Sequence, residues 1–108
     1  MKEIIFFRDS KGNCPFEIWN NGLKDFMAQA KVLAYVTRVA KGLSLKNVRA
    51  IEGKIKEIKI DYGPGYRVYF AEVSNAIILL LTGGNKGTQT RDIKKAKGYW
   101  EEYHASKK

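Results

Sequence analysis

The sequence has few of the residues that hold small domains together by covalent bonds or metal ions. Among its 108 residues there is one cysteine, Cys14, and one histidine, His104. A single cysteine excludes an intramolecular disulfide and a cysteine-based metal cluster. We therefore expect no metal and no cofactor. The low cysteine content is typical of a protein from a reducing compartment such as the cytoplasm.

Long hydrophobic segments are also absent. The longest apolar run, residues 76–81, is far shorter than the roughly 20 residues that a membrane-spanning helix needs. Residues 1–3 are not followed by the apolar stretch and small-residue cleavage site of a signal peptide. We therefore expect a cytoplasmic protein with no membrane partner.

The length and the 44% hydrophobic content predict one globular domain over residues 1–108. Its charge is one-sided, because 20 Lys and Arg stand against 11 Asp and Glu, a formal net charge of +9. The excess lies in residues 24–67 and 86–108, whereas residues 68–85 hold no Lys or Arg. Such a balance is typical of a protein that binds a polyanion, most often nucleic acid. The alternative is that the lysines only improve solubility.

Local sequence patterns predict four strands and three helices. The strands are expected over residues 3–8, 56–61, 66–73 and 76–82, and the helices over residues 15–21, about 24–41, and from Thr88 or Thr90 onward. Pro64 and Gly65 favour a type II turn between two strands. Residues 43–53 are expected to be irregular, and residues 83–87 to form a tight strand-to-helix turn.

This order predicts an α+β domain, with a mainly antiparallel four-stranded twisted sheet, two N-terminal helices packed on one face and a C-terminal helix. Helical spacing in the long helix predicts a buried face made of Phe26, Ala30, Leu33, Thr37 and Ala40. The basic residues of the same helix, spaced by seven, fall on another face: Lys24, Lys31 and Arg38.

Alternation along the strands predicts a polar set on one face of the sheet. Since Ile58, Ile60, Val68 and Phe70 are the expected core residues, the residues between them point the other way. The loop and helix after the last strand bring further cations. The candidate site consists of Lys54, Glu57, Lys59, Arg67, Tyr69, Lys86 and Arg91.

Cations at this density are suited to a phosphate chain, and Tyr66 and Tyr69 to stacking on unpaired bases. A solvated sheet face is the alternative. The same groups support RNA cleavage, in which a 2′-hydroxyl attacks the neighbouring phosphate while Arg and Lys stabilise the developing charge. Glu57, or Lys59 in its neutral form, would take the proton, and no metal is needed.

Several blocks together resemble one known family. They are WNNGLKD at residues 19–25, YGPGYRVYF at 62–70, LLLTGGNK at 79–86, QTRDI at 89–93 and AK at 96–97. Over about residues 16–97 the chain resembles the addiction-module killer proteins, phage-derived Gp49-like toxins of the HigB kind within the RelE/ParE superfamily.

The resemblance implies a compact RelE-like fold and a toxin that inhibits translation by cutting messenger RNA, often on ribosomes. It also implies a cognate antitoxin, usually a helix-turn-helix protein of the HigA kind, that forms a hetero-oligomer with the toxin. By position, Arg67 matches the arginine that clamps phosphate, Lys86 the basic residue after the last strand, and Lys59 one strand lysine.

The chain also departs from the family pattern. Glu57 stands where RelE toxins have a second lysine, and Asp92 or Ile93 where they have a tyrosine that assists the chemistry. Proton transfer would then fall to Glu57 and another residue, or the activity would differ. Two other functions stay open: a non-catalytic inhibitor of DNA gyrase, as ParE toxins are, and a plain RNA-binding module. The cations around Arg67 favour the nuclease.

Overall fold

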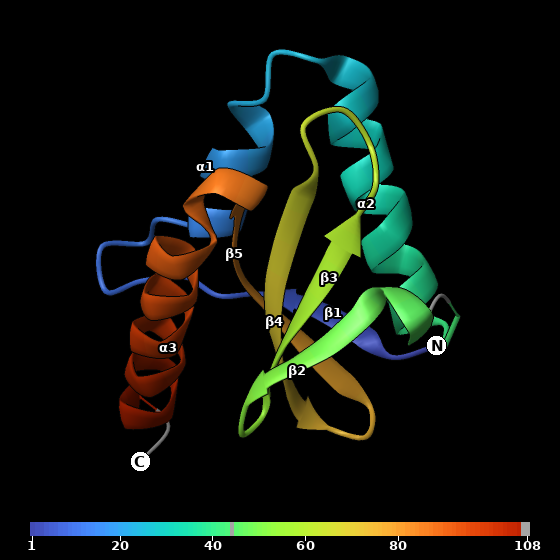
Figure 1. Ribbon diagram of the computed structural model, residues 1–108. Coiled ribbons are helices and arrows are strands. Elements are labelled where there is room, and N and C mark those ends of the chain that lie inside the picture. Colours follow the sequence, from blue (N-terminus) through green and yellow to red (C-terminus); the bar gives the residue numbers. More distant parts are fainter. Residues whose placement is uncertain (44, 107–108) are drawn as a thin grey trace.

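The computed structural model describes residues 1–43 and 45–106. Within this part of the chain, five strands form one mixed sheet in the order β1-β5-β4-β3-β2 (Figure 1). β1 pairs with β5 in parallel, and every other neighbouring pair is antiparallel. The strand bounds are Glu3–Phe6 for β1, Val48–Glu52 for β2, Ile55–Ile60 for β3, Tyr66–Ser74 for β4 and Ile77–Asn85 for β5.

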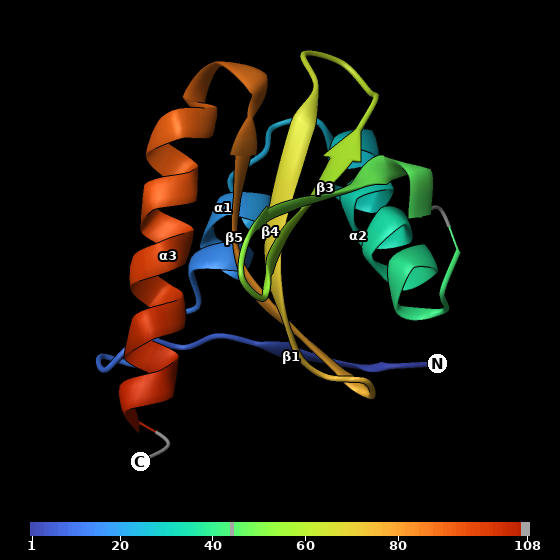
Figure 2. The same cartoon turned by 60° about the horizontal axis from the view of Figure 1, so that its bottom comes forward.

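Helices cover both faces of the sheet, so that two apolar layers enclose it. α1 (Pro15–Asn21) and α2 (Phe26–Ala40) lie on one face, and α3 (Gln89–Ser106) lies on the other, alongside β5 (Figure 2). Val32, Val68 and Phe70 belong to the first apolar layer, and Tyr69, Leu81 and Ala96 to the second. None of the helices described here is long and apolar enough to cross a membrane.

The predicted α+β class is correct, but the sheet has five strands instead of the four predicted, and its β1–β5 pair is parallel. Residues 48–52, expected to be irregular, form the edge strand β2. A register shift between Ala50 and Glu52 interrupts the pairing of β2 with β3. Because such a bulge breaks the alternation of side chains, the period-two signal of a strand is lost in the sequence.

Residues Gly83 and Gly84 continue β5, although they were expected to form a turn. A Cβ at Gly83 would lie 2.2 Å from the ring of Trp19, and one at Gly84 would lie 1.7 Å from Asp92 Oδ2. The strand therefore needs two glycines, because α1 and α3 press on it from opposite faces.

The predicted buried face of α2 is wrong except for Ala40, which is buried. Phe26 is 81% exposed and Leu33 47% exposed. The observed buried face is centred about a third of a turn away and consists of Ala28, Val32, Val36, Val39 and Ala40. Small and β-branched residues let α2 approach the sheet closely, and the larger apolar residues are left outside. Asp25 begins the helix by accepting hydrogen bonds from the backbone N–H groups of Met27 and Ala28.

Candidate functional site

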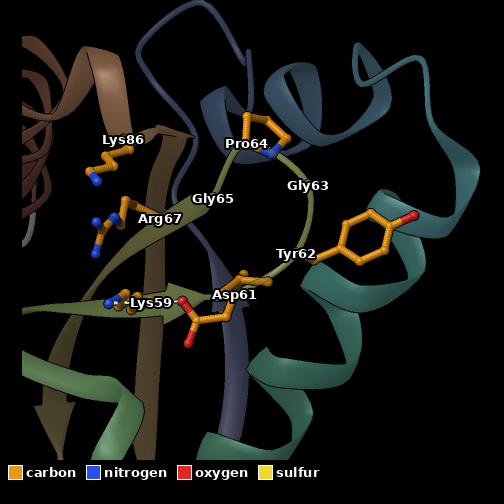
Figure 3. A pocket seen from close by; sticks show the side chains of 9 residues that line it. Lys59, Asp61, Tyr62, Gly63, Pro64, Gly65, Arg67 and Lys86 are labelled. Atoms are coloured by element: carbon orange, nitrogen blue, oxygen red, sulfur yellow. Dashed lines mark ion pairs between the residues drawn. The ribbon is translucent and has the colours of Figure 1, made fainter.

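Three of the four predicted catalytic residues line one hollow. It has a volume of about 420 Å³ and is bounded by residues 59–65, Arg67 and Lys86. We call it the first hollow. In Figure 3, Lys59, Arg67 and Lys86 lie one above another with their nitrogens pointing to the same side. The side chain of Asp61 turns back to Lys59, with Oδ1 3.8 Å from Nζ.

Strand register brings these cations together. Lys59 on β3 lies opposite Arg67 on β4, and Arg67 lies opposite Gly84 on β5. Lys86 follows the end of β5, and its backbone N–H donates to the carbonyl of Gly65 at 3.1 Å. Since Gly84 has no side chain, the space beside Arg67 on β5 is left to Asp92 and Thr88 from the following helices. The row of charges is therefore held on paired strands.

The turn at the rim of the first hollow is fixed at both ends. Gly63 and Gly65 have φ of 56° and 85°, values that favour glycine. The backbone hydrogen bond runs from Gly65 N–H to the carbonyl of Tyr62, one residue earlier than a type II turn centred on Pro64 and Gly65 would have it. The hydroxyl of Tyr62 donates to Asp25 Oδ2 at 2.9 Å, which ties the turn to the start of α2.

Glu57, the fourth predicted catalytic residue, lies beneath the cations. Its side chain is 2% exposed. Oε1 lies 3.6 Å from Arg67 Nη1 and 3.3 Å from Arg49 Nη2, and Oε2 accepts a hydrogen bond from Gln89 Nε2 at 2.7 Å. Both carboxylate oxygens are thus engaged. A general base must reach the hydroxyl that it deprotonates, so this position favours a role in orienting Arg67.

A second hollow of about 350 Å³ adjoins the first and shares Lys59 and Arg67 with it. Its other lining residues are Lys46, Asn47, Val48, Arg49, Glu57 and Gln89. Arg49 is not among the predicted site residues, because residues 43–53 give no regular strand pattern in the sequence, and neither is Gln89, because its approach to Glu57 depends on the path of α3. The signal for Arg49 is weak but present: Gly53 and Lys54 separate two β-branched stretches, as in a hairpin.

The two tyrosines expected to stack on bases are not available for stacking. Tyr69 points to the predicted face, but α3 covers it and it is fully buried. Burial, and next the negative charge of Glu57, raise the pKa of Tyr69 above its ordinary value. Tyr66 belongs to the opposite face, where its ring centroid lies 6.1 Å from that of Trp19. Neither ring is therefore exposed enough to stack on a base in this structure.

Lys54 and Arg91 lie away from the first hollow. Lys54 lies in the turn between β2 and β3, next to the end of β3 that is remote from Lys59. Arg91, on the first turn of α3, lines another hollow beside Trp19 and Thr82. Its Nε lies 3.5 Å from Asp92 Oδ1. In the described residues, no three His, Cys, Asp or Glu side chains gather as a metal site would require.

No family model matches this chain. It is similar to a protein of Haemophilus influenzae (strain ATCC 51907 / DSM 11121 / KW20 / Rd) that is described as an uncharacterized protein. The two sequences are 38% identical over 87 residues, which cover 81% of this chain and 87% of the relative. Identity at this level over nearly the whole of both sequences means that the chain belongs to the same protein family as this Haemophilus influenzae protein.

Proposed function

We propose that the chain is a toxin of the RelE/HigB kind, with a compact RelE-like fold, that arrests translation in the cytoplasm by cutting messenger RNA. The observation that carries the proposal is Arg67. Its side chain is 12% exposed and ion-paired with the buried Glu57, and it lines the hollow between Lys59 and Lys86. An arginine held in this way is suited to a phosphate, because its guanidinium donates two parallel hydrogen bonds in a fixed geometry.

The reaction follows from these positions. The 2′-oxygen of one nucleotide attacks the adjacent phosphorus, the bond from phosphorus to the 5′-oxygen breaks, and a 2′,3′-cyclic phosphate remains. Arg67 and Lys86 stabilise the negative charge that develops on the phosphate oxygens. The 5′-oxygen leaves with a proton from the ammonium group of Lys59.

The proton of the 2′-hydroxyl needs an accessible acceptor. Glu57 is enclosed by its three partners, whereas the side chain of Asp61 is 66% exposed at the rim of the same hollow. We therefore assign proton acceptance to Asp61 and the positioning of Arg67 to Glu57. This assignment changes the role that the sequence alone suggested for Glu57.

A direct experiment separates this function from its alternatives. The chain is expressed from an inducible promoter, and growth, message integrity and DNA damage are followed during the first minutes. The proposal expects growth arrest together with new 5′ ends in messages. DNA damage with intact messages would support gyrase inhibition, and RNA binding with intact messages and normal growth would support a plain RNA-binding module. Either of these two results overturns the proposal.

The partner that we propose is an antitoxin that docks on the outer face of α2. This face carries exposed apolar side chains, including Phe26, Met27 and Leu33. By helical spacing, Lys31 and Arg38 run along one border of it. An amphipathic antitoxin helix with acidic residues at that border would complement the face in both polarity and charge.

This docking face has a consequence for inhibition. α2 packs on the sheet face opposite to that of α3 (Figure 2), whereas Glu57 beneath the cations bonds to Gln89, the first residue of α3. An antitoxin on α2 would therefore leave Arg67 uncovered. It would act by making the toxin too large to enter the site on the ribosome where the messenger RNA is bound. The complex would keep its affinity for short RNA.

A further inference from the structure

The second hollow has its own set of polar groups, apart from the two cations that it shares with the first. Lys46 and Asn47 come from the short 3₁₀ helix Leu45–Asn47, and Arg49 comes from β2. Gln89, at the start of α3, lines the opposite side. None of these residues takes a bond-making or proton-transfer step in the reaction proposed at Arg67, and they extend the concave surface toward the sheet edge at β2.

The charges of the two hollows are unequal. Five cations line them, namely Lys46, Arg49, Lys59, Arg67 and Lys86, against the two carboxylates of Glu57 and Asp61. The excess of three positive charges is larger than one phosphodiester neutralises. Arg49 is also incompletely used by the protein, since its side chain is 61% exposed although Nη2 reaches Glu57. The free edge of its guanidinium is available to a second anion.

We propose that the second hollow is a phosphate subsite for single-stranded RNA, which holds the backbone next to the phosphate bound at Arg67. The proposal rests on the proposed function, because it takes Arg67 as the position of the reacting phosphate. Lys46 and Arg49 are the residues that hold the second phosphate, and Gln89 helps to position Arg49 through their shared partner Glu57. The substrate enters as a continuous strand that passes through both hollows.

The lining predicts how such a strand is recognised. Among the described residues that line the two hollows, Tyr62 is the only aromatic one, and its ring turns toward α2 (Figure 3). Stacking of bases on aromatic rings, a common device of single-strand binders, is therefore not provided here. Binding depends on backbone charge, so it should vary little with base sequence and strongly with salt.

The test uses the full chain and RNA analogues that cannot be cleaved. Oligonucleotides with 2′-O-methyl groups keep every phosphate but lack the attacking hydroxyl. A dinucleotide with one phosphodiester fills only the first hollow, and a hexanucleotide reaches both. Binding is measured at several salt concentrations for the original chain, Arg67→Gln, Lys46→Gln and Lys24→Gln. The last variant is the matched control, since Lys24 is an exposed lysine near the start of α2 that lines neither hollow.

For the hexanucleotide, Lys46→Gln should weaken binding and lower the slope of log affinity against log salt by about 0.7, the value for one lost phosphate contact to a single strand. For the dinucleotide, the affinity and salt slope of Lys46→Gln should equal those of the original chain. Equal effects of Lys46→Gln and Lys24→Gln on hexanucleotide binding would overturn the proposed phosphate subsite. The proposal that the first hollow binds a phosphate at Arg67 would still stand. Undiminished dinucleotide binding by Arg67→Gln would instead contradict the proposed function, and a chain that binds neither oligonucleotide would contradict both.

Discussion

Glu57 and Arg67 form an ion pair in which both side chains are largely removed from water, with Oε1 and Nη1 3.6 Å apart. The pair joins β3 to β4 on the side of the sheet where the cations gather. Because Gln89 and Arg49 hold the same carboxylate, Arg67 has few orientations open to it. A preorganised donor of this kind stabilises a charged transition state without reorganising during the reaction.

The two carboxylates of the site should behave differently when neutralised. Glu57→Gln should destabilise the fold by about 1–3 kcal/mol, because the largely buried Arg67 loses its ion-pair partner, and should slow RNA cleavage. Asp61→Asn should leave stability nearly unchanged and slow cleavage by about a hundredfold or more, because it removes the proposed proton acceptor. Cleavage rates and denaturant unfolding of both variants measure this. Normal cleavage by Asp61→Asn, with cleavage lost in a folded Glu57→Gln protein, would mean that Glu57 is the base.

The contact between Tyr62 and Asp25 should make stability depend on pH. The hydrogen bond from Tyr62 holds the pKa of Asp25 below its ordinary 3.8, and the same bond raises the pKa of Tyr62 above 10.0. A lowered carboxyl pKa contributes stability above pH 4 that is lost in acid, and a raised phenol pKa contributes stability below pH 10 that is lost in base. Tyr62→Phe should therefore be less stable than the original chain between about pH 4 and pH 10, and the difference should shrink as the pH falls through the lowered pKa of Asp25 or rises through the raised pKa of Tyr62.

Denaturant unfolding of the two proteins at a series of pH values measures this difference. A constant gap between them across the whole range would mean that the hydroxyl acts through packing alone.

Two glycine substitutions should have opposite effects. Gly84→Ala brings a methyl group against Asp92 and Thr88, and overpacking of this kind costs about 1–3 kcal/mol or more. Gly98→Ala, in the middle of α3, meets no atom within 4 Å, and should stabilise the helix by about 0.5–1 kcal/mol. Thermal unfolding of the pair checks the close packing of α3 on β5. A tolerated Gly84→Ala would mean that α3 lies farther from the strand.

The outer face of α2 should govern antitoxin binding and not catalysis. Leu33→Glu places a negative charge in the apolar stripe, where an acidic partner would be repelled. The variant should cleave RNA normally and lose inhibition by the proposed antitoxin. Ala28 lies on the buried side of the helix, so a substitution there would disturb the fold instead of this surface. If the antitoxin still inhibits Leu33→Glu, it binds a face other than the outer face of α2.

Local sequence patterns predict much of the fold, and each element that they predict wrongly has a physical reason. The helix over Pro15–Asn21 was predicted with its observed bounds, since Pro15 begins it and Gly22 follows it. The wrong face of α2 was chosen because hydrophobicity alone favours Phe26 and Leu33, whereas close packing on the sheet selects Ala28 and Val32. Local sequence does not report which face a neighbouring element covers.

The candidate site shows the same division. Alternation on β3 and β4 correctly gave Glu57, Lys59, Arg67 and Tyr69 one common face. Their exposure could not be read from the same pattern, because it depends on where α3 crosses the sheet after the chain has turned at Asn85. As a result, alternation alone places Tyr69 on the surface and gives no reason to include Gln89, which reaches Glu57 from α3.

The most direct test of the central claim is the cleavage rate of single-stranded RNA by purified Arg67→Gln, beside Lys24→Gln with the same change of charge. Loss of one preorganised donor to a charged transition state lowers the rate by about a hundredfold to a thousandfold. Arg67→Lys should recover little of this, because one ammonium does not replace two parallel donors. The account predicts such a loss in a folded Arg67→Gln protein and a normal rate in Lys24→Gln. Equal rates for the folded Arg67→Gln variant and the original chain would contradict it.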